Sequence, residues 1–120
     1  MIAHAGRLAV TLSSLALFVG LSLPVQADPV ADFYRGKTIN LIVGTSAGND
    51  YDFRGRLIAR HMSRHIPGEP IIVPQNMPGA GGIKAANYIA TIAPKDGTVV
   101  HMVMTNMMAA QAMGLPGIEF

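Results

Sequence analysis

The most constraining feature of this sequence is a repeated pattern, in which an apolar, β-branched run ends in a glycine-containing turn and a helical pattern follows. The first glycine turn is residues 44–50 (Gly-Thr-Ser-Ala-Gly-Asn-Asp), and the second glycine turn is residues 76–82 (Asn-Met-Pro-Gly-Ala-Gly-Gly). Strands and helices that alternate along a chain form parallel sheets with right-handed crossovers. The repeat therefore predicts an α/β fold built from a βαβαβ unit.

The apolar runs predict three strands, at residues 38–43, 70–75 and 98–104. Helices are expected after both glycine turns, the second ending before Pro94, and a third helical stretch is expected at residues 107–113. Residues 32–37 are interpreted as a polar lead-in to the first strand.

The helix after the first glycine turn shows the clearest periodicity. Its apolar residues recur at helical spacing and predict the buried face, and they are Phe53, Leu57, Ile58, Met62 and Ile66. Asp50 or Asp52 is expected to cap its amino end, where a negative charge also suits the helix dipole. Asp52 has a second interpretation, as a side chain that orients a ligand amine or a water molecule.

The positions of the glycine turns predict a binding cleft for a small anion. In an open parallel sheet the loops at the carboxyl ends of the strands meet the amino ends of helices, whose unpaired N–H groups attract anions. The alternative is that each turn is a plain connection between a strand and a helix, in which glycine supplies only a positive φ.

The amino terminus predicts export. Arg7 precedes an uncharged apolar stretch at residues 8–23, Pro24 follows it, and Val25-Gln26-Ala27 resembles a signal peptidase site. Residues 1–27 are therefore predicted to be a signal peptide cleaved before Asp28. An uncleaved anchor is the alternative, but the apolar stretch is shorter than the ~20 residues that a spanning helix needs. After cleavage we expect no membrane-spanning segment.

Charge and cysteine content exclude several classes of function. Without Arg7, eight basic side chains face seven acidic ones. That near-neutral balance disfavours binding to nucleic acid, which needs a basic surface. The chain has no cysteine, so disulfides and thiolate metal sites are excluded, and packing alone must hold the core.

No pattern in the chain predicts an enzyme, a cofactor or a metal. The first glycine turn lacks the Gly-Lys-Ser/Thr of a P-loop, and Lys84 occupies the third glycine position of a dinucleotide fingerprint. Ser46 lacks a nucleophile elbow. His61 and His65 are four residues apart, but no third metal ligand is evident. Arginines also recur every four residues, which is typical of a solvated helix face or of a surface for an acidic partner: Arg56, Arg60 and Arg64.

Several segments of the chain resemble one family, the periplasmic solute-binding proteins of tripartite tricarboxylate transporters (the Bug or TctC-like family). The most specific segment is Gln-Asn-Met-Pro-Gly-Ala-Gly-Gly at residues 75–82. The others lie at residues 33–39, 42–44, 46–48, 51–52, 56–61, 66–68 and 93–98.

The resemblance implies a two-lobed clamshell, of the Venus-flytrap type, in the periplasm of a Gram-negative bacterium. Such a receptor captures a carboxylated solute and delivers it to the integral-membrane permease subunits of the transporter. Residues 28–120 would be part of its first lobe, with the hinge and the second lobe outside this sequence.

The resemblance also implies which residues contact the solute. They are Thr45, Ser46, Ala47, Gly48 and Asn49 of the first glycine turn, Pro78, Gly79, Ala80, Gly81 and Gly82 of the second, and Thr105 and Asn106 after the third strand; Asp52 is a further candidate. Asn49 and Asp50 stand where the family usually has more glycine, and they add bulk and negative charge beside the expected anion site.

Two other functions remain alternatives to a solute receptor. The chain could be a truncated fragment without transport function that retains the family's core pattern. A weaker alternative is an enzyme that binds a phosphate-bearing cofactor.

Overall fold

The computed structural model describes residues 27–120. The predicted signal peptide therefore lies outside the described residues, apart from Ala27. The helices are α2 (Pro29–Tyr34), α3 (Asp50–Met62), α4 (Ile83–Asn87) and α5 (Met107–Ala112), and the strands are β1 (Thr38–Val43), β2 (Ile71–Asn76) and β3 (Val99–Met102). Within these residues, no helix combines the length and the apolar character needed to cross a membrane.

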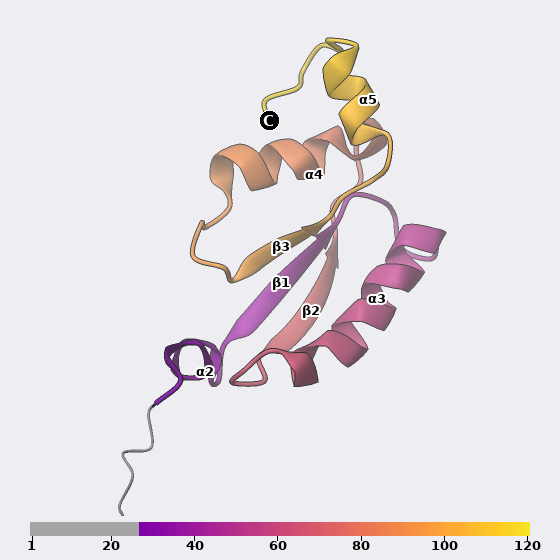
Figure 1. Ribbon diagram of the computed structural model, residues 1–120. Helices are drawn as coiled ribbons and strands as arrows, with labels where there is room; N and C mark the ends of the chain where they lie inside the picture. The colour runs from indigo at the N-terminus through magenta and orange to yellow at the C-terminus, as the bar shows by residue number, and fades with distance from the viewer. Residues whose placement is uncertain (1–26) are drawn as a thin grey trace, which may run out of the picture.

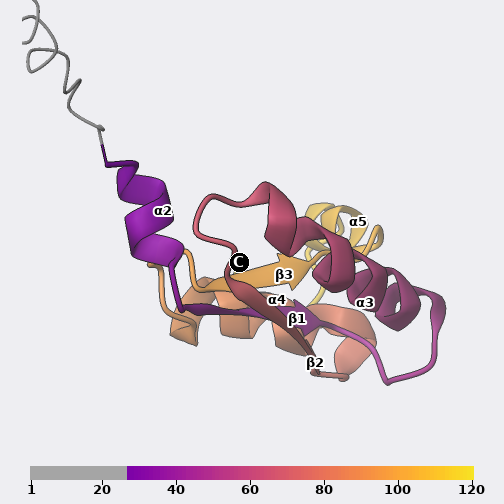
Figure 2. The ribbon, with the colours of Figure 1, turned by 90° about the horizontal axis from the view of Figure 1, so that it is seen from below.

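The three strands form a parallel sheet with the order β2-β1-β3. The chain passes from β1 to one side of it, and then from β2 across to the other side. Because such crossovers are right-handed, two crossovers in opposite directions put their helices on opposite faces of the sheet. Figures 1 and 2 show this arrangement, with α3 on one face and α4 on the other. The predicted α/β fold with a βαβαβ unit is confirmed.

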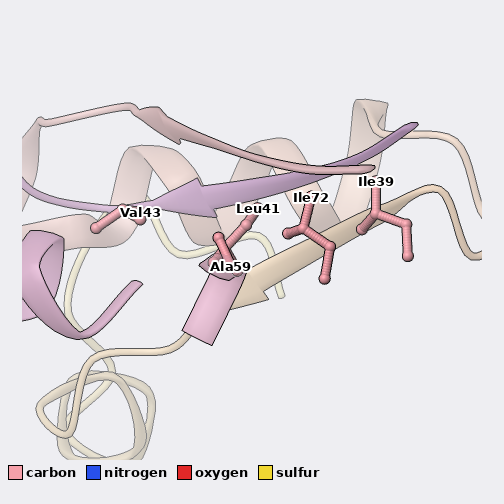
Figure 3. Close-up of a cluster of buried hydrophobic side chains, with 5 residues drawn as sticks. All are labelled: Ile39, Leu41, Val43, Ala59 and Ile72. Carbon is pink, nitrogen blue, oxygen red and sulfur yellow. The ribbon is translucent and has the colours of Figure 1, made fainter. Parts of the chain in front are cut away.

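The main apolar cluster lies between the sheet and α3. Alternate residues of β1 point to this face and are almost fully buried, together with residues of β2 and α3: Ile39, Leu41, Val43, Ile72 and Ala59 (Figure 3). Ile42 points to the opposite face, where α4 lies, and is also buried. Burial on both faces of the sheet explains why the second half of β1, residues 41–43, is apolar at every position rather than alternating.

The predicted buried face of α3 is wrong. Phe53, Leu57, Ile58 and Met62 are 67%, 46%, 38% and 36% exposed, whereas Ile66, which lies beyond the end of α3, is partly buried against the core cluster as predicted. The helix instead buries Asp52, Gly55 and Ala59, which share the same helical spacing. A Cβ added at Gly55 would lie 3.0 Å from Val43 Cγ2. Small residues thus let the helix backbone lie close against the sheet, and the larger apolar residues face outward.

The predicted cap of α3 is also wrong, since Asn49 caps it. Its side-chain oxygen accepts a hydrogen bond from the backbone N–H of Asp52, while Asp50 and Asp52 occupy the first turn. The interpretation of residues 32–37 as a polar lead-in is incomplete as well, because their first half, residues 32–34, belongs to α2. Asp28 caps α2 through the N–H groups of Val30 and Ala31.

The remaining element limits differ slightly from the predicted ones. The limits of β1 are confirmed, β2 begins and ends one residue later than predicted, and β3 ends two residues earlier. The second predicted helix changes at residue 88 into a π-helical turn, Tyr88–Ile92, in which the N–H of Ala93 donates to the carbonyl of Tyr88 at 2.9 Å.

Val43→Ala tests which residues hold α3 on the sheet. Val43 is 0% exposed, so we expect its truncation to lower the free energy of unfolding by about 2 kcal/mol through lost burial and the cavity left behind. Phe53→Ala is the control and should change that free energy by less than about 0.5 kcal/mol. Urea denaturation measures both, and a larger loss for Phe53→Ala would contradict the close-packed small face.

Candidate functional site

The strand order determines where a ligand can bind. In open α/β sheets, ligands bind outside the carboxyl ends of the strands, at the point where the strand order reverses. Here β1 lies between β2 and β3, so this switch point lies between β1 and β3. The first glycine turn leaves β1, the second leaves β2, and residues 103–106 leave β3. All three segments therefore emerge from the same end of the sheet (Figure 1).

Close backbone packing joins the second glycine turn to β1 and to the segment after β3. A Cβ added at Gly44 would lie 3.2 Å from the Cα of Gly82, and one added at Gly82 would lie 2.5 Å from Met104 Sδ. Gly82 also has a φ of +94°, in the region that favours glycine. The positive φ therefore favours glycine at this point, and a Cβ there would also force the Met104 side chain to shift. The side-chain amide of Asn106 donates to the carbonyl of Gly81 at 3.3 Å.

Tyr51 joins the first turn of α3 to the segment after β3. Its hydroxyl accepts a hydrogen bond from the N–H of Thr105 at 3.3 Å and lies 3.2 Å from the Thr105 hydroxyl. These hydrogen bonds from Thr105 lower the pKa of Tyr51 from its usual value. Tyr51 was not predicted as a site residue. Its role depends on β3 lying beside β1, and strand order leaves no signal in the sequence.

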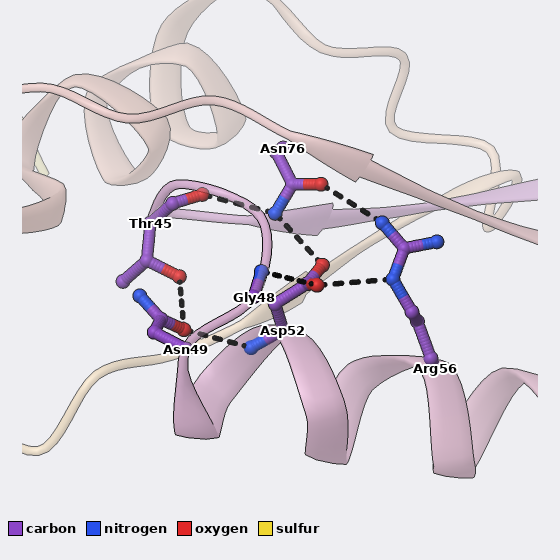
Figure 4. A network of polar contacts seen from close by, with 6 residues as sticks. All are labelled: Thr45, Gly48, Asn49, Asp52, Arg56 and Asn76. Carbon is purple, nitrogen blue, oxygen red and sulfur yellow. Dashed lines mark hydrogen bonds and ion pairs between the residues drawn. The ribbon is translucent and has the colours of Figure 1, made fainter.

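A network of polar contacts around Asp52 fixes the shape of the first glycine turn (Figure 4). Asp52 is 4% exposed. Its carboxylate accepts hydrogen bonds from Arg56 Nε at 3.0 Å, from the N–H of Gly48 at 2.9 Å and from Asn76 Nδ2 at 2.9 Å. The Arg56 guanidinium, with these other donors, lowers the pKa of Asp52 to about 2. Asp52 is thus a neutralised, fully engaged carboxylate that supports the turn.

Two asparagines complete this network. Asn49 Oδ1 accepts from the hydroxyl of Thr45 at 2.9 Å and from the N–H of Asp52 at 3.0 Å. Asn76 Nδ2 donates to the carbonyl of Thr45 at 3.0 Å, and Asn76 Oδ1 accepts from Arg56 Nη2 at 3.2 Å. Asn76, at the end of β2, therefore connects the first glycine turn to the second. Neither Asn76 nor Arg56 was predicted to have this supporting role.

The first glycine turn also presents donors that the network leaves free. Within residues 27–120, the backbone N–H groups of Ser46 and Ala47 donate to no other residue, and both residues are exposed. Asn49 uses its oxygen as the helix cap, and in the same described range its Nδ2 has no partner. These three N–H donors lie beside the amino end of the 13-residue helix α3, whose dipole favours negative charge there.

Some predicted site residues of the second glycine turn lie away from the contacts described above. Pro78, Gly79 and Ala80 are exposed in the second glycine turn, and the nearest atoms to a Cβ placed at Gly79 belong to Lys84, in the helix that follows. Ala80 has a φ of +45°. That conformation is costly for a residue with a Cβ, so the neighbouring structure must hold it in place.

The two histidines and two of the arginines that recur every four residues contact neighbouring side chains of this chain. Arg64 lies within 3.3 Å of a ring nitrogen of His61 and of one of His65. Arg56 is engaged by Asp52, and Arg64 lies beyond the end of α3, in the 3₁₀ turn Ser63–His65. In the described part of the chain, no three His, Asp or Glu side chains are placed to hold a metal ion.

Comparison with known proteins gives one informative similarity. No family model matches the chain. The chain is 37% identical over 103 residues to the "UPF0065 protein in gbd 5'region" of Cupriavidus necator, a match that covers 86% of this chain and 29% of that protein. The chain thus spans under a third of the length of that relative. UPF0065 is a designation of the Bug family, so the similarity supports the resemblance found in the sequence.

The pKa of Asp52 predicts an acid-dependent loss of stability. Its pKa is about 2 in the folded chain against an ordinary value of 3.8, so its contribution is fully present above about pH 4 and is lost as the pH falls through about 2. Urea denaturation across this range should show the loss. Asp52→Asn should lack this component, while Asp50→Asn, which removes an exposed charge from the same helix turn, should keep it. An unchanged acid profile in Asp52→Asn would contradict the network.

Gly82→Ala tests whether the close approach of the second glycine turn to Met104 matters for stability. The added methyl meets Met104 Sδ and an unfavourable positive φ, so we expect a loss of at least about 2 kcal/mol in the free energy of unfolding. Gly81→Ala is the matched control. Its φ is +61° and its nearest contact, Asn106 Nδ2, is 3.6 Å away, so the left-handed conformation alone should cost about 1 kcal/mol. Equal losses measured by urea denaturation would show that the close approach to Met104 is unimportant.

Proposed function

We propose that this chain forms the solute-contacting part of the first lobe of a periplasmic receptor, which captures a carboxylated small molecule for a tripartite tricarboxylate transporter. The observation that carries the proposal is the first glycine turn. It lies at the switch point of the sheet, is fixed by the Asp52 network, and presents free N–H donors at the amino end of α3. The similarity to a UPF0065 protein supports it independently.

Backbone and amide dipoles are well suited to hold a carboxylate here. The N–H groups of Ser46 and Ala47 and the amide of Asn49 donate without carrying a full charge. Asp52 would repel an anion if it were unpaired, but Arg56 neutralises it at 3.0 Å. Asp50 is the remaining acidic group of the turn, and it pairs with Arg54 at 2.9 Å. The negative charge that Asp50 adds beside the expected anion site is therefore offset by Arg54 of the same helix.

We propose that tight capture of the solute also requires a second lobe. Two-lobed receptors complete the hydrogen bonds of the ligand and remove it from water when the second lobe closes. The donors described here contact one side of a ligand only. We therefore expect the chain alone to bind weakly, and we propose that a second lobe completes the capture of the solute in the periplasm and that the solute is then delivered to the integral-membrane permease subunits.

A titration followed by NMR tests the proposal. Succinate added to the ¹⁵N-labelled chain should shift the amides of residues 46–49 with a dissociation constant of about 1 mM or weaker, equivalent to about 4 kcal/mol of binding free energy. ATP and glucose are the controls. Shifts with ATP but not with carboxylates would support the cofactor-binding alternative, and no shift with any carboxylate would contradict solute capture by this turn. Micromolar affinity would contradict the need for a second lobe.

Ala47→Glu should weaken succinate binding at least about tenfold, because a like charge beside the free N–H donors costs the bound carboxylate about 1.4 kcal/mol or more. Ile92→Glu is the control with the same added charge. Ile92 is 73% exposed and precedes β3, at the opposite end of the sheet from the glycine turns. Equal weakening in both variants would mean that net charge rather than the turn determines binding.

A further inference from the structure

The outer side of α3 carries apolar side chains and arginines next to one another. On its inner side α3 packs against β1 and β2, and it forms the outer layer on that face of the sheet (Figure 2). Phe53, Leu57 and Arg60 have the spacing i, i+4, i+7, which places them on one side of the helix, and all three are exposed. Together with Arg56 they line a hollow of about 140 Å³. We call these four residues the outer α3 surface.

Part of the positive charge on this helix has no acidic partner. The two acidic residues of α3 are each paired with the arginine four residues later, so Arg54 and Arg56 are compensated. Arg60 forms no ion pair with another residue of the described range 27–120. Arg64, in the turn after α3, lies against the rings of His61 and His65, which carry no negative charge. The outer α3 surface therefore keeps a positive charge beside its apolar residues.

The residue types of this region are those of protein interfaces. Residues 50–65 contain four arginines and no lysine. Arginine and aromatic residues are enriched where proteins contact one another, and lysine is depleted there. The guanidinium is more weakly hydrated than an ammonium group, and it pairs with a carboxylate through two hydrogen bonds. Phe53 and Leu57 also line the same hollow instead of being scattered singly. These features favour contact with a protein over a helix face that meets only water.

Other occupants fit this surface less well. A basic segment that holds an anionic membrane typically needs a cluster of about four or more Lys or Arg residues, whereas two of the four arginines here are neutralised by aspartates. A symmetric dimer through this surface would bring arginines of both copies together, and like charges repel. An apolar cover would leave Arg60 buried without a counter-charge, which is costly. An occupant that carries carboxylates avoids these problems.

We infer that the outer α3 surface is a docking site for an acidic segment of another protein, in which an apolar side chain lies between carboxylates. The apolar side chain enters the hollow lined by Phe53 and Leu57, and the carboxylates pair with Arg60 and with the half-exposed Arg56. The inference goes beyond the proposed function, which assigns no surface to a protein partner. It also uses a different side of α3 from the buried Asp52, so it does not depend on carboxylate capture by the first glycine turn.

An amphipathic peptide is the probe for this site. A peptide of about 15 residues, with leucines along one helical side and glutamates beside them, is added to the ¹⁵N-labelled full chain. It should shift the amides of residues 53–61. A peptide with glutamine in place of every glutamate should bind at least about tenfold more weakly, and one with lysine more weakly still, because the charge complementarity is lost.

Two substitutions in the surface and one matched control complete the test. Arg60→Glu should weaken binding of the glutamate peptide at least about tenfold and allow binding of the lysine peptide, because it reverses the charge. Lys84→Glu makes the same change of charge at an exposed residue of α4, on the opposite face of the sheet (Figure 2), and should leave both affinities unchanged. Phe53→Ala should weaken binding at least about fivefold. Its free energy of unfolding is expected to stay close to that of the unsubstituted chain, so this loss would not reflect unfolding.

Several results would overturn the inference. Equal binding of the glutamate and lysine peptides, or no shift of residues 53–61, would show that this surface does not select an acidic segment. Binding to vesicles of phosphatidylglycerol and phosphatidylcholine in equal parts, without binding of the glutamate peptide, would identify a membrane as the occupant instead. Shifts of residues 53–61 that grow with the concentration of the chain alone would identify a second copy. Succinate binding is measured at residues 46–49, so failure of one proposal leaves the other standing.

Discussion

The buried carboxylate of Asp52 is the interaction on which the candidate site depends. It joins three parts of the chain that are distant in the sequence or differ in structure, namely the N–H of Gly48 in the first glycine turn, Arg56 on α3 and Asn76 at the end of β2. A glycine turn by itself is conformationally permissive. A buried anion that must be satisfied by specific donors restricts it to one shape, since leaving any donor or acceptor unpaired costs free energy. The hydrogen bonds that Asp52 makes inside the turn therefore also fix the positions of the exposed N–H groups of Ser46 and Ala47.

The sequence predicted the strands well because their signal is local. The β-branched run of β1 and the glycine that follows it are sufficient to place that strand, and the limits of β2 and β3 differ by at most two residues from the predicted ones. The order of the strands is not local. It decides that β3 lies beside β1, and thereby that Tyr51 meets Thr105. No spacing within the sequence carries that information, so this contact was missed although the glycine turns were identified.

The buried face of α3 was wrong for a different reason. Periodicity alone cannot distinguish a large apolar stripe from a stripe of small residues, because both recur every three or four positions. Gly55 and Ala59 allow close contact with Val43 and the rest of β1, whereas Phe53 and Leu57 would hold the helix further away. The buried Asp52 belongs to the same stripe, so the helix rotation that packs the small residues also directs this carboxylate toward Asn76.

The two faces of the sheet have different electrostatic surroundings. On the α3 side, the buried carboxylate of Asp52 is paired with Arg56, Gly48 and Asn76, and among residues 27–120 the N–H groups of Ser46 and Ala47 are left for a ligand. On the α4 side, the surroundings are apolar and one imidazole nitrogen has no partner in the described chain. Low polarity makes an unpaired atom costly and a single well-placed hydrogen bond valuable. A ligand that binds the first side should therefore be selected by its negative charge.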